Sequence, residues 1–396
     1  MRRYGMNSQD NREHNRAALL SLVRNHGPIS RSELARLSGL SKPVVTEIVD
    51  SLINANLVYE SYKAKSGVGR RPVMLKLNQD SLRILGIDLA RTRIEFMVTD
   101  LKGNALKTVR LPLSTENEEF SAPNLLDILT RTATEMMQEF EVIGIGIAHP
   151  LPLSSRWRVI VGAVQRSGWY TLDLQKALSQ EINVPIFVGN DADVAALYEK
   201  WFGVADDLKD FIYIMVGEGI GAGIFCAGQP LRGHKGMAGE FGHIMANPNG
   251  RQCLCGKRGC LETELAIPVL LAKASQACGY PIHSVEQLSE RLAAGSSALE
   301  QVLNDYASTA AVHIGNLVNI FDPECVIMGG EIAHLDKYLE ERLHQGLQEV
   351  VHPLLQESVT LRFSPSADNM VAKGASILVQ EHFFAYPHEY ISEFRG

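Results

Sequence analysis

Hydrophobic residues in the first 60 positions recur with helical spacing in consecutive segments. In the first segment, Ala17, Leu20 and Val23 fall on one face, and the pattern stops at residues 27–28, a Gly-Pro pair. A second, short helix is predicted after Ser30, because Glu33 follows it at the spacing of a capping box. Two helices with a tight break between them are therefore expected.

A third helix is predicted after a turn at Gly39, where a residue free to adopt positive φ is needed. Ser41 is its expected cap, and Pro43 lies in its first turn. The expected buried stripe consists of Val45, Ile48, Val49 and Leu52, and the expected outward residues are Lys42, Thr46, Glu47 and Asp50. This order of helices and turn is that of a helix-turn-helix, whose last helix enters the major groove with its N-terminal end.

Two short strands are predicted at residues 57–59 and 72–77, joined by a glycine-rich basic loop that includes Arg70 and Arg71. A basic loop on a hairpin suits a wing that reaches phosphates or the minor groove. We therefore expect a winged helix-turn-helix DNA-binding domain at residues 1–80, with DNA contacts from Ser41, Lys42, Pro43, Thr46, Arg70 and Arg71. The alternative is a purely structural three-helix module with a solvated hairpin.

Beyond residue 80, apolar runs typical of strands alternate with helical patterns. Two groups of strands, each with its own helices, predict two lobes with a cleft between them. The expected strands cover residues 84–89, 94–100, 142–147, 185–191, 211–216 and 325–330, and long helices are expected at 299–320 and near the C-terminus. We expect an α/β effector and oligomerisation domain at residues 81–396.

Charge is distributed unevenly along the 396 residues. The net charge is −7, but residues 1–77 hold thirteen Lys and Arg against six acidic residues, a net +7 that leaves −14 for the rest. A basic head on an acidic body favours a double-stranded DNA partner, although a solvated basic helix would give the same charge. No apolar run reaches membrane-spanning length and the start of the chain is polar, so we expect a cytoplasmic protein that does not enter the membrane.

From Ile84 onward the sequence resembles the ROK family (repressors, open reading frames, kinases), and with the head it resembles the repressor branch, which includes glucose, N-acetylglucosamine and xylose repressors. The most specific match joins a Glu-Phe-Gly-His segment at 240–243 to a Cys-Leu-Cys-Gly-Lys-Arg-Gly-Cys-Leu-Glu segment at 253–262. The resemblance implies an actin-like (ribonuclease-H-like) two-lobed ATPase-type fold. It also implies a sequence-specific repressor of carbohydrate-metabolism genes, controlled by a sugar or sugar-phosphate effector.

Three of the six cysteines fall within eight residues, in a pattern typical of metal binding rather than disulfides. Together with His243, the residues Cys253, Cys255 and Cys260 offer one nitrogen and three thiolates, which close a tetrahedral zinc shell. All four positions are filled by protein, so the predicted Zn²⁺ is structural. Three unmetallated cysteines beside an unrelated histidine are the alternative.

The resemblance also implies a sugar pocket. In the kinases of the family an Asn-Asp pair binds sugar and its Asp is the catalytic base, and Asn190 and Asp191 match that pair. Glu240, His243 and Glu262 match further residues that contact sugar hydroxyls. Without the family, these polar residues could simply cap the ends of strands.

The phosphate side departs from the kinase pattern. Ala90 and Arg91 replace the two glycines of the first phosphate loop, and Glu218 replaces the threonine of the second. The side chains of Ala90 and Arg91 block the close approach of the backbone to a polyphosphate, and Glu218 adds a negative charge beside it. We therefore expect no enzyme activity, with Asp191 a vestigial base.

A further departure lies after Ile147, where His149 and Pro150 replace the usual Pro-Gly. This change leaves the identity of the effector open. The alternatives are an active ATP-dependent sugar kinase and a repressor controlled by a protein partner. A homodimer or homotetramer is expected because a winged helix that reads two half-sites needs a dimer, and either long helix offers a candidate interface.

Overall fold

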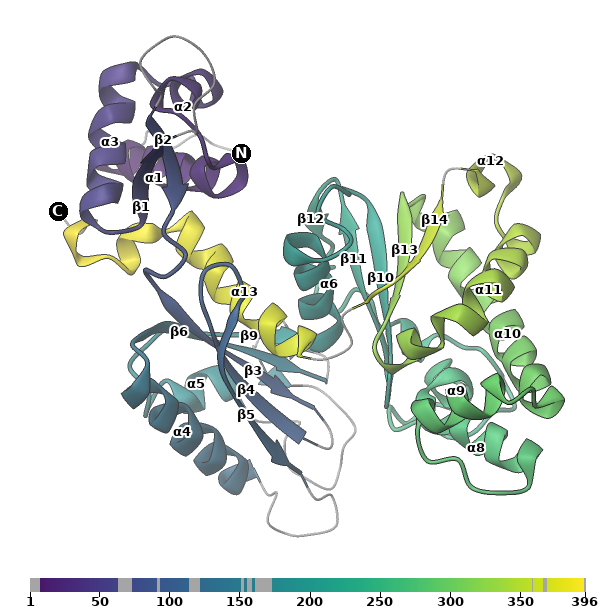
Figure 1. Ribbon diagram of the computed structural model, residues 1–396. Helices are drawn as coiled ribbons and strands as arrows, with labels where there is room; N and C mark the ends of the chain where they lie inside the picture. Colours follow the sequence, from purple (N-terminus) through teal and green to yellow (C-terminus); the bar gives the residue numbers. More distant parts are fainter. Residues whose placement is uncertain are drawn as a thin grey trace.

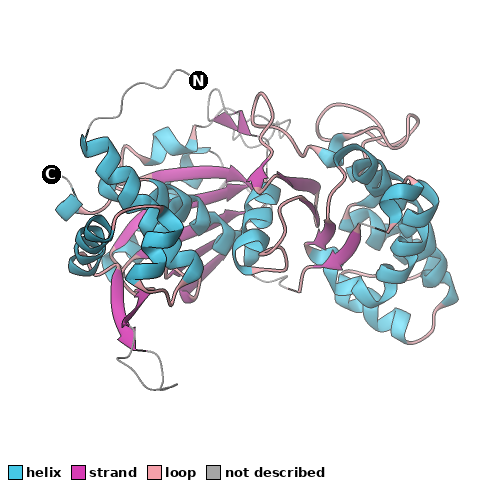
Figure 2. Ribbon diagram, turned by 90° about the horizontal axis from the view of Figure 1, so that it is seen from above, coloured by secondary structure: helices cyan, strands magenta, loops and turns pink. Residues whose placement is uncertain are grey.

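The protein consists of a small head and a two-lobed body, as the computed structural model shows (Figure 1). Both views show the helices of the second lobe gathered on its outer side, away from the first lobe (Figure 2). The structure describes residues 8–62, 73–90, 93–113, 122–150, 153–154, 159–160, 173–357, 359–365 and 369–394.

The head is a winged helix-turn-helix, as predicted. Its elements are α1 (Ser8–His26), α2 (Arg31–Ser38), α3 (Lys42–Asn54) and the antiparallel strands β1 (Val58–Tyr62) and β2 (Val73–Leu77). Ser30 and Glu33 form the expected capping box, and Gly39 has a φ of +71°. Ser41 holds the N-cap position of α3, but its side chain makes no capping hydrogen bond. Pro43 removes one of the two N–H groups that this side chain could accept from, because it is the second residue of the helix and has no N–H to donate.

The first lobe is a five-stranded mixed sheet covered by helices on both faces. Its strand order is β5-β4-β3-β6-β9, with α13 against β3 and β6 and with α4 and α5 in the hydrophobic core of the other face. Gly86 and Gly146 allow α13 to approach, because a Cβ atom at either would clash with the carbonyl oxygen of Ala372 or Ala375. The bounds are β3 (Arg83–Leu89), β4 (Arg93–Thr99), β5 (Ala105–Pro112), α4 (Ala122–Glu139), β6 (Val142–His149), β7 (Leu153–Ser154), β8 (Val159–Ile160), α5 (Leu174–Leu178) and β9 (Ile186–Asn190).

The second lobe repeats the arrangement with strand order β12-β11-β10-β13-β14. Its largest hydrophobic core lies between this sheet and the outer helices α8 to α11. The bounds are α6 (Asp191–Phe202), β10 (Phe211–Val216), β11 (Ile220–Cys226), β12 (Gln229–Pro230), η3 (Phe241–His243), α7 (Glu262–Leu265), α8 (Ile267–Cys278), α9 (Val285–Ala293), α10 (Ser297–Phe321), β13 (Cys325–Gly329), η4 (Glu331–Leu335), α11 (Asp336–Val350), α12 (Pro353–Gln356) and β14 (Thr360–Phe363).

Helices α6 and α13 (Met370–Ala385) pack against each other between the lobes. The far end of α13 continues into the head, where Phe383 and Phe384 share one hydrophobic core with Leu19, Leu20 and Val23 of α1. The chain ends in two short turns beside α1, η5 (Pro387–Glu389) and η6 (Ser392–Phe394). Helix α13 is therefore a core element, and so is α10, which packs against α8 and α11 in the core of the second lobe. The oligomer interface predicted for one of these helices stays a prediction.

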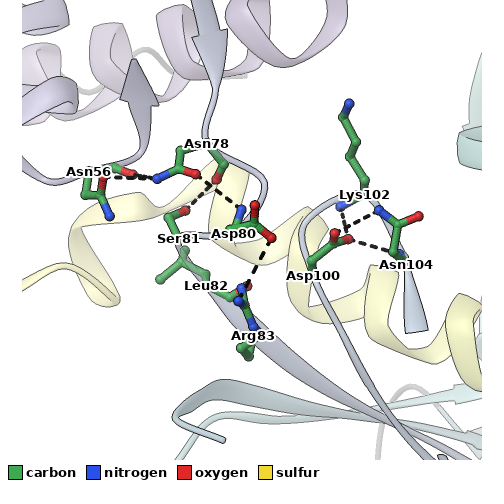
Figure 3. Close-up of polar contacts among 9 residues, drawn as sticks. All are labelled: Asn56, Asn78, Asp80, Ser81, Leu82, Arg83, Asp100, Lys102 and Asn104. Carbon is green, nitrogen blue, oxygen red and sulfur yellow. Dashed lines mark hydrogen bonds and ion pairs between the residues drawn. The ribbon is translucent and has the colours of Figure 1, made fainter. Parts of the chain in front are cut away.

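A short, hydrogen-bonded turn connects the head to the body (Figure 3). The Asn78 side chain donates to the backbone and side-chain oxygens of Asn56 at 2.9 and 3.0 Å, and the backbone carbonyl of Asn78 accepts from the Ser81 hydroxyl at 2.7 Å. On the body side, Asp100 accepts from the backbone N–H groups of Lys102 and Asn104 at 2.8 and 2.9 Å. The Leu101 backbone N–H on the body donates to the Gln79 carbonyl of the connecting turn at 3.2 Å, so this turn contacts the body in addition to the contacts that α13 makes with the head.

Among the described residues, no helix combines the length and apolar character that crossing a bilayer requires.

Candidate metal centre, sugar pocket and DNA-contacting face

The loop between η3 and α7 brings four potential metal ligands together. His243, Cys253, Cys255 and Cys260 each offer one ligand atom, and these four atoms all lie within 4.8 Å of one another. The Nδ1 atom of His243 lies 3.6 Å from Cys253 Sγ, and the Sγ atoms of Cys255 and Cys260 lie 3.6 Å apart. Gly259 makes the turn possible, because a Cβ atom there would clash with the carbonyl oxygen of Asn247.

The thiols of this cluster perturb one another. Burial raises the pKa of Cys260 to about 12, and hydrogen bonds to Cys255 and Cys253 add to the effect. Burial also acts to raise the pKa of Cys255, but hydrogen bonds from the backbone at Lys257 and from the other thiols outweigh it and lower that pKa. A divalent cation would favour all three thiolates together. One nitrogen and three sulfurs are the donor set of a closed structural zinc site, so these residues fit that metal.

Glu240 and Glu262 stand next to this cluster. The Oε2 atom of Glu240 lies 3.8 Å from His243 Nε2, on the edge of the ring that faces away from the sulfurs. Glu262 is buried and accepts a hydrogen bond from the Ile220 backbone N–H at 3.2 Å. Burial, and then the charge of Glu262, raise the pKa of Glu240 to about 7. Glu240 can therefore donate or accept a proton near neutral pH.

Asn190 and Asp191 lie where β9 passes into α6. The Asn190 side-chain oxygen caps α6 by accepting from the backbone N–H groups of Ala192 and Asp193 at 3.0 and 3.4 Å. Burial raises the pKa of Asp193 to about 7, with Glu240 adding to the rise and Arg232 opposing it. Glu240 therefore lies within electrostatic range of Asp193 in the first turn of α6, and the shared sugar pocket stays a prediction. The capping role of Asn190 is the simpler alternative that the sequence left open.

His149 is the backbone partner of Asn190 in the parallel pairing of β6 and β9, and it is fully buried. The position that departs from the family pattern therefore adjoins the predicted sugar-binding pair. Pro150 follows directly, and residues 151–152 lie outside the described part of the chain.

On the phosphate side, the first hairpin contains an internal ion pair. Arg93 Nη2 lies 3.3 Å from Oδ2 of Asp88, and burial raises the pKa of that aspartate to about 6. Ala90 follows β3, whereas Arg91 lies outside the described residues. Arg93 therefore already neutralises the carboxylate that would face a nucleotide.

The second phosphate loop brings two carboxylates near each other. Glu218 occupies the turn between β10 and β11, and Glu331 follows the Gly329-Gly330 turn after β13. Burial, and then the charge of Glu218, raise the pKa of Glu331. If a polyphosphate bound at this turn, it would meet two carboxylates of like charge.

The N-terminal end of α3 is open to solvent. Ser41, Lys42, Pro43 and Thr46 are all exposed, whereas the predicted stripe of four apolar residues is buried. Thr46 donates its hydroxyl to the Lys42 carbonyl at 2.9 Å. Arg70 and Arg71 lie outside the described residues.

Arg31 fixes the position of α3 in the head. Its guanidinium lies 2.9 Å from Asp50 on α3 and 2.5 Å from Glu60 on β1. A separate pair joins Arg12 of α1 to Glu47 at 2.6 Å. The acidic residues of α3 are thus paired within the head, which leaves Lys42 as the exposed charge at the start of the helix.

Sequence reasoning missed Asp193, Arg232, Arg93 and Glu331. Asp193 had a usable signal, because it stands two residues after Asp191 in the first turn of a predicted helix. Arg93 had a local signal as well, because its partner Asp88 lies in the same hairpin. Arg232 and Glu331 gave none, since the groups they act on, Asp193 and Glu218, lie far away in the sequence.

These features define a class: a winged-helix head joined to a two-lobed sugar-kinase fold. Two family models agree with it, one for the MarR family over residues 13–64 and one for the ROK family over residues 84–382. The ROK model covers most of the chain, and the chain belongs to the ROK family.

Relatives of similar length carry regulatory names. The chain is 30% identical to the xylose repressor of Bacillus spizizenii over 370 residues, which cover 93% of this chain and 95% of that protein. It is 29% identical to NagC of Escherichia coli, a DNA-binding transcriptional dual regulator, over 82% of both chains.

Solved structures also include a regulator that matches nearly the whole chain. A ROK-family transcriptional regulator described as a homologue of the E. coli MLC protein matches 98% of this chain and all of its own, with 25% identity and a TM-score of 0.83. The ROK hexokinase of Thermus thermophilus matches 76% of this chain and all of its own, with 29% identity and a TM-score of 0.63. The body is therefore similar in fold to a sugar kinase, and the whole chain is similar in fold to a transcriptional regulator.

Proposed function

We propose that this protein is a sequence-specific DNA-binding repressor of carbohydrate-metabolism genes, controlled by a sugar or sugar phosphate. The observation that carries the proposal is the union, in one chain, of a winged helix with an exposed recognition-helix start and a sugar-kinase-fold body. Regulators matched over nearly the whole chain share this union. A DNA target also makes the cytoplasm the expected location.

In this proposal the start of α3 reads the major groove. Lys42 and Thr46 contact bases or phosphates, supported by Ser41 and Pro43 at the helix start. Arg70 and Arg71 contact phosphates or the minor groove from the wing. The head, residues 1–80, acts as the DNA-binding unit, and residues 81–396 act as the effector and oligomerisation unit. A homodimer or homotetramer supplies the second half-site reader.

The effector binds in the cleft, where Asn190, Asp191, Glu240, His243 and Glu262 present amide, carboxylate and imidazole groups to hydroxyls. The contacts of Glu240 with His243 and of Glu262 with Cys253 support a common binding surface for these residues. Structural Zn²⁺ held by His243, Cys253, Cys255 and Cys260 would fix the loop that carries Glu240. The residues themselves orient the sugar, and the metal supplies rigidity.

An active sugar kinase is the second candidate, and Asp191 in the position of a catalytic base favours it. Ala90, Arg91 and Glu218 oppose it, and the Asp88–Arg93 pair adds a further obstacle on the phosphate side. Control by a protein partner in place of a small ligand is the third candidate. A kinase would transfer the γ-phosphoryl group of ATP to a hydroxyl of its sugar and release ADP, whereas a protein partner would co-purify with the repressor.

The decisive experiment selects duplexes from fragmented genomic DNA with the full-length protein and then measures affinity by fluorescence anisotropy. Lys42→Ala should weaken binding about tenfold and reduce the salt dependence of binding by about one charge. Lys337→Ala, on α11 far from the head, is the matched control and should bind as the wild type does. Failure to enrich any sequence, or equal loss in both variants, would contradict DNA reading by α3.

A further inference from the structure

A cavity of about 420 Å³ opens where the head meets both lobes of the body. Its walls come from four segments: Arg24 of α1, Trp201 of α6, residues 229–232 after β11, and Glu381 and Phe384 of α13. The volume falls within the usual range for small-molecule pockets. Figure 1 shows α13 running from the body into the head beside α1, which places this junction next to the head.

Arg24 is the main cation of the cavity. Its guanidinium carbon lies 3.3 Å from the centre of the Trp201 ring and 4.7 Å from that of Phe384. Burial lowers its pKa to about 10, and Glu381 is the only acidic group that opposes this. Among the described residues Arg24 has no hydrogen-bond or ion-pair partner within contact distance. Because arginine contacts rings with its face, its in-plane N–H donors remain available.

Arg232 adds a second cation to the lining of the cavity. It is exposed, and its charge acts on both Asp193 and Glu381. Glu381 also interacts with the Trp201 side chain by a hydrogen bond, so this carboxylate is already engaged. Two arginines against one carboxylate leave the cavity with a net positive charge beside an aromatic wall.

We propose that this junction cavity is a second ligand site, for a small metabolite that carries a carboxylate or phosphate group. Arg24 and Arg232 bind the anionic group, and Trp201 and Phe384 pack against the remainder of the ligand. Guanidinium groups suit both anions because they donate paired hydrogen bonds to two oxygens. The site is distinct from the sugar pocket, which lies at the other end of α6.

The location gives such a ligand influence over the head. Helix α6 begins at Asn190–Asp191 and reaches Trp201 about 16 Å further along its axis. The segment that holds Arg232 continues to Glu240 of the sugar pocket. Both segments therefore reach from the proposed sugar pocket to the junction cavity. A bound anion would connect Arg24 of the head to these two segments at their cavity ends. Anion and sugar would then each alter the affinity for the other.

The test measures anion binding to the full-length protein without DNA, so its result does not depend on the proposed function. Inorganic phosphate, glucose 6-phosphate and citrate are titrated by calorimetry and thermal shift, with chloride at equal ionic strength as reference. At least one of the three should bind and raise the apparent melting temperature. Arg232→Ala should weaken that binding at least tenfold, and Arg24→Gln should do the same with circular dichroism confirming an intact fold.

Two control variants locate the site. Lys235→Ala removes the same charge from the same segment outside the cavity, and Asp191→Asn alters the sugar pocket; neither should change the anion affinity. The proposal is overturned if none of the three anions binds. It is also overturned if Asp191→Asn weakens binding while Arg232→Ala does not, or if Arg232→Ala and Lys235→Ala weaken it equally.

Discussion

The Nε2 atom of His243 lies 3.8 Å from the carboxylate of Glu240, while Nδ1 of the same ring faces the sulfur of Cys253 at 3.6 Å. One imidazole therefore joins the candidate metal centre to the candidate sugar pocket. A ligand histidine is held by its metal in one orientation and one tautomer. The state of the metal centre should consequently determine how well Glu240 is positioned.

Loss of the metal centre should impair the sugar response. Wild-type protein is expected to hold about one zinc per chain, and Cys255→Ser should lose it and lower the thermal stability. Elemental analysis and thermal unfolding measure these effects. Cys278→Ser is the control, because Cys278 lies outside the cluster and should keep both the zinc and the sugar-dependent stabilisation. A full zinc content in Cys255→Ser would argue against the ligand assignment.

Asp193 should make stability depend on pH. Because burial raises its folded-state pKa to about 7, the unfolded chain loses this proton first as the pH rises from 4 to 7. The contribution of Asp193 to the free energy of unfolding is therefore fully present below the pKa of the unfolded chain. It is lost as the pH rises through about 7. A tenfold difference in proton affinity between the folded and unfolded chain corresponds to about 1.4 kcal/mol, so the effect is on the order of a few kcal/mol.

Asp193→Asn should remove much of the fall in unfolding free energy that the wild type shows as the pH rises. The variant should therefore be more stable than the wild type, and the difference should grow towards pH 8. Denaturant titrations at pH 5, 6, 7 and 8 give the comparison, with the surface variant Asp305→Asn as control. Parallel pH profiles for wild type and Asp193→Asn would show that this carboxyl ionises normally in the fold.

The phosphate side should bind nucleotide poorly. Glu331 and Glu218 repel the phosphates, and Arg93 is paired with Asp88. We expect no hexose-dependent conversion of ATP to ADP in a coupled assay over a hexose panel. Glu218→Gln combined with Glu331→Gln should strengthen Mg-ADP binding several-fold in calorimetry, because two negative charges are removed, without restoring turnover. Robust wild-type turnover that Asp191→Asn abolishes would instead identify a kinase.

Phe383 should stabilise the head although it belongs to the C-terminal helix. Its side chain is fully buried in the core shared with Leu19 and Leu20 of α1. Phe383→Ala should cost about 3–5 kcal/mol of unfolding free energy, and hydrogen exchange in α1 should accelerate. Tyr386→Ala, at a half-exposed neighbouring position, should cost far less. Unchanged exchange in α1 would show that the head folds independently of α13.

The helix-turn-helix and the cysteine cluster could be predicted from the sequence, because the interactions that define them join residues close together in the chain. The capping of α2 joins Ser30 to Glu33, and the sulfur ligands lie within eight residues of chain. Interactions of such short range depend on spacing alone, which a sequence displays directly. The strand pattern of the body likewise follows from which residues are apolar.

The relationships between distant segments could only be decided by the tertiary structure. Arg24 meets Trp201 and Phe384, and α13 joins the core of a head that begins more than 300 residues earlier. The sequence determined a winged-helix head, two lobes and a compact set of metal ligands, because each follows from local periodicity or spacing. Only the fold decided which charges lie close together at the head–body junction and in the cleft, since that proximity depends on how whole helices and sheets pack.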